Sequence, residues 1–258
     1  MKIGKKITLM CLSFFYLYNT VIQMEVFADE KVKPEWVPEI SAETSFETKY
    51  IWRGQTLVDN AVIQPGASLG FNGFKFSVWG NYDAGLLDRL TEWDYTFDYT
   101  LNVGTVKDEL NVDIGIPEIF DPMEISLGYI LYTFPNLSGN AFDSQEIYAG
   151  FSYTAFGLTP MVKYYCDFDS GSGSYWEFGG SYFAELAKDI NAGISTVAGY
   201  NAGQWGYDRS FSNLLFSGDI AVTVLKYFVL SPNVNYSLAL DKQYSSEFYG
   251  GIKVSIEY

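Results

Sequence analysis

Apolar and polar residues alternate along most of the chain from residue 42 onward. In Ser45–Gly54, "SFETKYIWRG", every second residue from Phe46 gives Phe, Thr, Tyr and Trp, and the intervening residues include Glu47, Lys49 and Arg53. Because successive side chains of a strand point to opposite faces, this period of two predicts strands with one apolar and one polar face.

Thirteen segments carry this alternation, and turn residues separate them. The strongest turn signal is Asn72-Gly73, which predicts a tight hairpin. The segments are 42–53, 61–72, 74–83, 92–102, 109–116, 124–134, 145–154, 158–168, 174–184, 189–200, 212–224, 228–240 and 247–258. A barrel whose two chain ends lie on one side needs an even number of strands. Segment 109–116 is the shortest and prolines follow it, so we assign it to a periplasmic excursion and predict twelve strands.

The length of the segments and the position of their rings favour a membrane barrel over a soluble sandwich. At about 10–13 residues, they match the length that a tilted strand needs to cross the hydrocarbon layer. Aromatic residues gather at the segment ends, as in the two interfacial girdles of a membrane barrel. The residues that we expect at the membrane interface are Tyr50, Trp52, Trp93, Tyr95, Trp176, Phe248 and Tyr258. The predicted fold is all-β, a transmembrane antiparallel up-and-down β-barrel over residues 42–258.

The N-terminal residues predict export. Lysines within residues 1–6 precede a mostly apolar run over 7–21, and Val26-Phe27-Ala28 offers acceptable residues at positions −3 and −1 of a cleavage site before Asp29. We expect a signal peptide over 1–28 and a periplasmic N-terminal segment over 29–41. The alternative, a retained transmembrane helix, is disfavoured because polar residues interrupt the apolar run.

Composition excludes several kinds of function. The formal net charge of −15 disfavours nucleic acid as a partner. The chain has no histidine, which removes the Ser-His, Asp-His and His-metal sites together. Asp94 and Asp98 share a strand face but would lie roughly 13 Å apart, too far for an acid–base pair. The "DFDSGSG" segment at 167–173 has Phe178 where a calcium loop needs Glu. We therefore expect no enzymatic activity, no metal and no cofactor.

Short motifs near the N-terminal end carry a family resemblance. The run Tyr50-Ile51-Trp52-Arg53-Gly54, then Gln64-Pro65, then the strand "FKFSVWGNYD" at 74–83, resembles the opening of TorF-like porins, a family of bacterial outer-membrane barrels. The third element departs from the family pattern, since Trp79 is followed by Gly80. The segments at 91–99 and 167–179 are also similar to barrels of this kind. The resemblance implies an outer-membrane location and a pore.

The polar faces of the predicted strands supply a candidate lumen. Ionised side chains avoid the cost of burial in lipid if they face a water-filled interior. The residues that we predict to line the lumen are Glu47, Lys49, Arg53, Lys75, Asp83, Glu92, Asp94, Asp98, Lys163, Asp167, Glu177, Asp219, Glu247 and Lys253. Their excess of acidic groups predicts diffusion of small hydrophilic solutes with a preference for cations.

Two rival roles and two further partners follow from the same pattern. The charges could instead pair across the interior, which would give a non-conducting structural barrel or one that recognises ligands through its surface loops. A barrel of this class contacts outer-membrane lipid and lipopolysaccharide. The aromatic C-terminus, Tyr258, ends an alternating strand and resembles the signal read by the barrel-assembly machinery.

Overall fold

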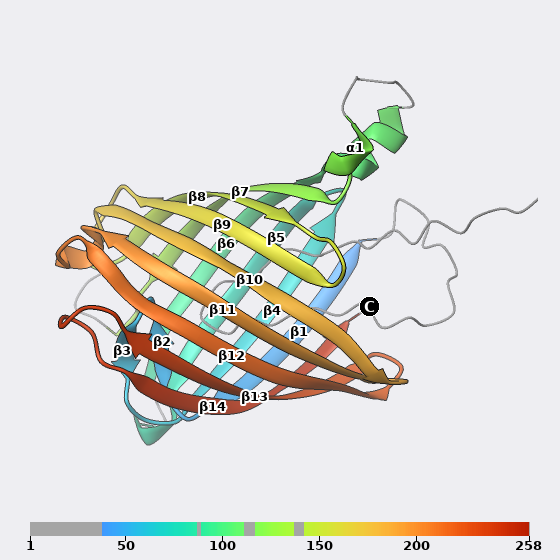
Figure 1. Cartoon of the computed structure of the whole chain (residues 1–258). Coiled ribbons are helices and arrows are strands. Elements are labelled where there is room, and N and C mark those ends of the chain that lie inside the picture. Colours follow the sequence, from blue (N-terminus) through green and yellow to red (C-terminus); the bar gives the residue numbers. More distant parts are fainter. Residues whose placement is uncertain (1–37, 87–88, 111–116, 137–141, 258) are drawn as a thin grey trace, which may run out of the picture.

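The computed structural model describes residues 38–86, 89–110, 117–136 and 142–257. Twelve of its strands form one closed barrel, and two short strands, β2 and β3, form a separate hairpin (Figure 1). The barrel strands are β1 (Glu39–Glu47), β4 (Val62–Phe71), β5 (Phe74–Asp83), β6 (Arg89–Asn102), β7 (Met123–Thr133), β8 (Ser144–Tyr153), β9 (Leu158–Asp167), β10 (Gly173–Ala187), β11 (Ile190–Ala202), β12 (Ser210–Leu225), β13 (Phe228–Ala239) and β14 (Glu247–Glu257). The hairpin strands are β2 (Tyr50–Trp52) and β3 (Gln55–Val58).

Each barrel strand pairs in antiparallel fashion with its neighbours in sequence, and β1 closes the ring. On one side, Ala42 of β1 lies opposite Ala67 of β4, and on the other it lies opposite Ile256 of β14. Closure leaves no unpaired edge, which is a condition for crossing a bilayer with strands. The predicted class and the predicted number of twelve barrel strands are confirmed.

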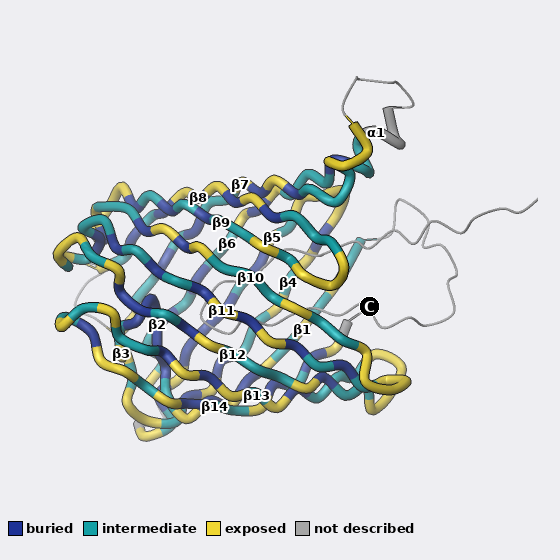
Figure 2. Tube along the Cα trace, in the orientation of Figure 1, coloured by how far each residue is buried: buried dark blue, intermediate teal, exposed yellow. Residues whose placement is uncertain are grey.

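The two faces of the wall differ in chemistry. Along β8 the buried residues Ser144, Glu146 and Tyr148 alternate with Ile147 and Phe151, which are exposed on the outside. Figure 2 shows this alternation along the strands. Large apolar side chains cover the outer face around the whole barrel, among them Phe46, Leu69, Phe76, Phe97, Leu127, Phe178, Ile194, Phe216, Val234 and Phe248. An apolar surface of this extent belongs in lipid, so the fold is that of an outer-membrane barrel.

The two ends of the barrel carry different connections. We call the end that holds the start of β1 and the end of β14 the turn end. Its connections include the tight turn Asn72-Gly73, where both residues have positive φ, 48° and 79°, as the primed hairpin turn requires. The turn end also carries the excursion between β6 and β7, with α1 (Val103–Leu110) and the 3-10 helix η2 (Glu118–Phe120). Figure 1 shows α1 beyond the barrel rim at this end.

The opposite end, which we call the loop end, carries the connections 48–61, 84–88, 134–143, 168–172, 203–209 and 240–246. Two of them contain 3-10 helices, η1 (Ala84–Leu86) and η4 (Gln204–Gly206). No helix among the described residues is long and apolar enough to span a membrane.

Two predicted segments differ from the observed elements by more than a few residues at their ends. The first strand was expected over 42–53, but β1 runs from Glu39 and ends at Glu47. Segment 109–116 is not a wall strand in its described part, because residues 109–110 belong to α1; residues 111–116 lie outside the described residues. The signal peptide over 1–28, most of the 29–41 segment and Tyr258 also lie outside them.

A charge on the outer face should oppose insertion. Phe97 lies near the middle of β6 and is 57% exposed. We expect Phe97→Arg to lower the free energy of unfolding in lipid vesicles by about 2–4 kcal/mol, because the guanidinium would lie in hydrocarbon. Phe97→Leu is the matched control, and denaturant titration gives both values. Equal stability of the two variants would contradict the assignment of this face to lipid.

Candidate functional site

The connection between β1 and β4 folds into the barrel. The last backbone hydrogen bond to a wall strand before it is the one that the Thr48 amide donates to the Gly250 carbonyl, at 3.0 Å. Beyond that point Tyr50, Ile51 and Trp52 are all buried at consecutive positions, which a wall strand with two different faces does not allow. The β2–β3 hairpin therefore lies inside the barrel near the loop end. The prediction that Tyr50 and Trp52 lie at the membrane interface is wrong.

The reversal of the hairpin occurs at Arg53-Gly54. Both residues have positive φ, 51° and 80°. Glycine adopts such values freely, whereas a residue with a side chain does so at a cost in energy. A Cβ at Gly54 would lie 3.2 Å from the Asn213 Cβ of β12, so the turn contacts the barrel wall.

The hairpin packs against wall residues from all around the barrel. Tyr50, Ile51 and Trp52 belong to one buried apolar cluster with inward-facing residues of eight strands. These wall residues are Val62, Trp79, Ile130, Tyr132, Tyr148, Tyr165, Tyr175, Leu215 and Tyr249. The hairpin is thus held in the cross-section of the barrel by apolar contacts, as a core is held in a soluble protein.

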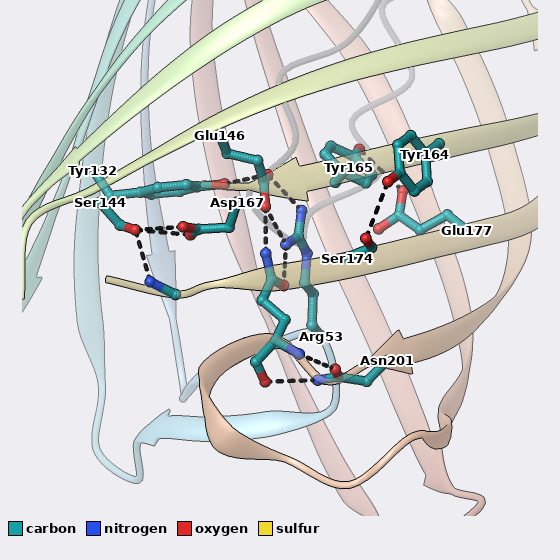
Figure 3. A network of polar contacts seen from close by, with 12 residues as sticks. Arg53, Tyr132, Ser144, Glu146, Tyr164, Tyr165, Asp167, Ser174, Glu177 and Asn201 are labelled. Atoms are coloured by element: carbon teal, nitrogen blue, oxygen red, sulfur yellow. Dashed lines mark hydrogen bonds and ion pairs between the residues drawn. The ribbon is translucent and has the colours of Figure 1, made fainter. Parts of the chain in front are cut away.

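Arg53 makes the central polar contacts of the hairpin. Its Nη1 and Nη2 donate to the two carboxylate oxygens of Glu146 at 2.8 Å each, and Nη1 also donates to Gln204 Oε1 at 2.5 Å. Figure 3 shows the guanidinium rising from the hairpin towards Glu146. This bidentate geometry is the strongest that an arginine and a carboxylate can form.

Glu146 receives further donors. Tyr132 Oη donates to it at 2.9 Å, and Gln204 Nε2 donates to it at 2.5 Å. Arg53 is 3% exposed and Glu146 is not exposed at all. Because a buried ion pair needs its remaining hydrogen-bonding groups satisfied, these extra donors are a condition for its stability.

Aromatic rings surround the Arg53 guanidinium. Its Cζ lies 4.3 Å from the ring centroid of Tyr165, and 4.6 Å from those of Tyr175 and Trp52. A cation within about 6 Å of a ring centroid is attracted by the negative face of the ring.

A second loop covers the hairpin from the loop end. Asn201 Oδ1 accepts hydrogen bonds from the amides of Gly203 and Gln204, which fixes the start of η4 and directs Gln204 inward. The Trp205 ring packs edge-on against Trp52 and Phe134, at centroid distances of 6.4 and 6.2 Å.

The packing excludes solvent from part of the barrel wall. At the level of the hairpin, inward-facing polar residues of five strands have no exposed surface. They are Asn81, Ser144, Glu146, Asn201, Ser212 and Ser237. In an open aqueous channel these positions would contact water. The hairpin together with Gln204 therefore forms a constriction, which we call the plug.

A separate ion-pair group lies at the rim. Lys49 Nζ is 2.6 Å from Asp59 Oδ1 and 2.8 Å from Glu247 Oε2. Hydrogen bonds to Asp59 and then Glu247 raise the pKa of Lys49 above its ordinary value. The lysine stays charged at neutral pH and joins the hairpin to the start of β14.

The other predicted lumen residues also point into the barrel. Those buried there are Glu47, Arg53, Asp83, Glu92, Asp94, Asp98, Lys163, Asp167, Glu177 and Lys253. Lys49, Lys75, Asp219 and Glu247 are half-buried. Of the predicted interface residues, Trp93, Tyr95, Trp176 and Phe248 lie on the outer face, each next to at least one buried inward-facing residue.

The sequence prediction missed several buried polar residues, among them Glu146, Glu124 and Gln204. Glu146 alternates with the outward-facing Ile147, so the period of two could have identified it, and Glu124 on β7 carries the same signal. Gln204 lies on a loop, where no periodicity exists to mark a residue that points inward.

Among the described residues, the interior has more acidic than basic buried groups, and Asp94 is one of the acidic ones. Within the described part of the chain, neither oxygen of Asp94 has a hydrogen-bond partner. Its cross-strand neighbours are Trp79 and Tyr132, which supply rings at that level of the wall. An acidic interior attracts cations and repels anions.

Comparisons with known proteins agree with the fold. No protein-family model matches the sequence, and neither does any curated protein. Among solved structures, the KdgM porin is similar at a TM-score of 0.52 and 14% identity, over 84% of this chain and 98% of that chain. The NanC porin is similar at a TM-score of 0.54 and 8% identity, over 85% of this chain and 98% of that chain. Outer membrane phospholipase A from Escherichia coli is similar at a TM-score of 0.51 and 10% identity, over 84% of this chain and 89% of that chain.

These likenesses define a class of fold. The three proteins share outer-membrane barrels of this shape although two are named as porins and one as a phospholipase. At such low identity, the activity of one protein does not follow from the fold that it shares with another.

The Arg53–Glu146 pair should be energetically coupled. We expect Arg53→Met or Glu146→Gln alone to lower the free energy of unfolding by about 3–5 kcal/mol, because each leaves a buried polar partner without its match. The double variant should lose less free energy of unfolding than the two single variants lose in sum. A double-mutant cycle from denaturant titrations measures the coupling, and strict additivity would contradict the pairing.

Proposed function

We propose that the chain is an outer-membrane channel for small hydrophilic solutes, with a preference for cations, and that the plug narrows its passage. The observation that carries the proposal is the plug itself. A hairpin that packs Tyr50, Ile51, Trp52 and its one arginine inside a polar barrel would narrow the route that solutes take through that barrel.

The orientation follows from the connections. Barrels of this class have short periplasmic turns and longer outer loops, so the turn end faces the periplasm and the loop end faces outward. The plug then lies on the outer side, where an entering solute meets it first. Outer-membrane lipid and lipopolysaccharide surround the apolar face.

Several finer proposals accompany this role. The motifs at Tyr50–Gly54 and 74–83 support membership of the TorF-like porins. Export through a signal peptide over 1–28 and insertion by the barrel-assembly machinery through the strand ending at Tyr258 complete the route to the membrane. We propose no enzymatic activity, because a chain without histidine lacks the base that hydrolytic triads use.

A second function is favoured by one observation. The inward-facing residues with no exposed surface fit a barrel that stays closed and acts as a structural or surface-recognition protein. Conductance separates this alternative from a channel.

Removal of the hairpin should open the passage. We expect replacement of residues 50–58 by a short Gly/Ser linker to raise single-channel conductance several-fold, because it removes the constriction from a twelve-stranded interior. The wild-type chain, refolded in the same way into planar bilayers, is the control. Equal conductance of the two, at any level above zero, would place the constriction elsewhere, and no conductance from either would favour the closed barrel.

The interior acidic groups should determine ion preference. We expect a wild-type reversal potential of cation-selective sign in a salt gradient. The double variant Asp94→Asn, Asp98→Asn should move it towards zero, because it removes two buried inward-facing charges. Asp208→Asn, at an exposed loop position, is the matched control and should change it little. Anion preference of the wild type would overturn this part of the proposal.

A further inference from the structure

The side chain of Arg53 is enclosed on all sides by groups from separate elements. Glu146 comes from β8, Tyr165 from β9, Tyr175 from β10 and Gln204 from η4. Tyr165 is 1% exposed, and Tyr175 and Gln204 are not exposed. With Trp52 of the hairpin, these residues form what we call the Arg53 pocket.

Each group of the Arg53 pocket matches a feature of a guanidinium. The two oxygens of Glu146 accept in parallel from Nη1 and Nη2 at 2.8 Å, a pairing that requires a planar fork of donors. Gln204 Oε1 accepts a further N–H at 2.5 Å. Three ring centroids lie within 4.6 Å of Cζ, and rings suit a planar, weakly hydrated cation. A lysine ammonium would make only part of these contacts.

Most of the Arg53 pocket belongs to the wall and the η4 loop rather than to the hairpin. Gln204 and Tyr132 both donate to Glu146, so the carboxylate is oriented by neighbours other than Arg53. Asn201 holds Gln204 through its backbone amide at 2.7 Å. The acceptor groups are therefore pre-organised, which lowers the cost of binding a guest.

The backbone at Arg53 indicates that the guanidinium determines the geometry of the turn. The residue has a φ of 51°, a value that glycine or asparagine adopts at lower cost. The contacts of the side chain offset that cost. The hairpin thus presents a guanidinium to a preformed pocket.

We propose that the Arg53 pocket is a guanidinium-binding site, occupied at rest by the chain's own Arg53, and that cations carrying a guanidinium group compete for it. The further idea that such cations also pass through the barrel rests on the proposed channel function. A guest in the pocket would hold the hairpin displaced, so guest binding and widening of the passage would be coupled. The tethered Arg53 competes at a high effective concentration, so free guests exchange with it weakly.

Replacement of Arg53 by alanine tests the binding site directly. Arg53→Ala removes the atoms beyond Cβ, which are those of the N-ethylguanidinium cation. We expect millimolar N-ethylguanidinium, well below denaturing levels, to raise the unfolding temperature of the variant barrel in detergent. n-Butylammonium at equal ionic strength is the control, and we expect it to bind at least about tenfold more weakly, because it cannot make the bidentate pair.

Two further proteins serve as controls. The wild-type barrel should show no comparable shift, because Arg53 fills the pocket. The double variant Arg53→Ala, Glu146→Gln should lose the preference for N-ethylguanidinium, since the carboxylate is gone. If Arg53→Ala does not fold alone, the yield of refolded, heat-modifiable barrel in each cation gives the same discrimination.

The proposal would be overturned if both cations raised the unfolding temperature of Arg53→Ala equally. It would also be overturned if this variant folded in the presence of neither cation. A preference that survives Glu146→Gln would also overturn it. The readout needs no conduction, so it is separate from the test of the channel. If the barrel binds N-ethylguanidinium but conducts nothing, the binding site is supported and the transport role is contradicted.

Discussion

The interior of this barrel depends on one buried ion pair. The guanidinium of Arg53 enters the barrel on a hairpin and meets the carboxylate of Glu146, and both side chains are buried. A charge in such a place is tolerated only with a matched partner and with its remaining hydrogen-bonding groups satisfied. Tyr132, Gln204 and the surrounding rings meet that requirement, so the pair requires that β7 to β10, the hairpin and η4 keep their relative positions.

This constraint gives the barrel two kinds of packing. Outside, apolar side chains face lipid with no specific partner, as in any membrane barrel. Inside and near the loop end, the hairpin and the inward-facing rings pack like the core of a soluble protein. An eight-stranded barrel fills its interior with its own wall side chains, whereas a wide porin leaves an aqueous channel. A twelve-stranded barrel lies between, and here a loop occupies the space that the wall side chains do not fill.

The sequence predicted the wall because the wall follows a period of two. The alternation around Phe97, Asp94 and Asp98 shows directly which face of the wall each side chain lies on. It marked thirteen segments, and the need for an even number of strands reduced them to twelve. It failed at Tyr50–Arg53, because those residues continue the alternation in the sequence but leave the wall after Thr48. Nothing local distinguishes a wall strand from an inward hairpin of similar composition; the distinction comes from contacts with eight other strands. Gln204 was missed for the same reason, since its position depends on the fold of its loop.

The position of the hairpin is the central claim, and a cross-link tests it most directly. An added Cβ at Gly54 would lie close to the Cβ of Asn213, within reach of a disulfide after small adjustment. In a Cys166→Ser background, Gly54→Cys with Asn213→Cys should form a disulfide under mild oxidation, detected as a shifted band that reductant reverses. Two free thiols, with the cysteine at position 54 open to an impermeant thiol reagent added from outside, would contradict an inward-folded hairpin.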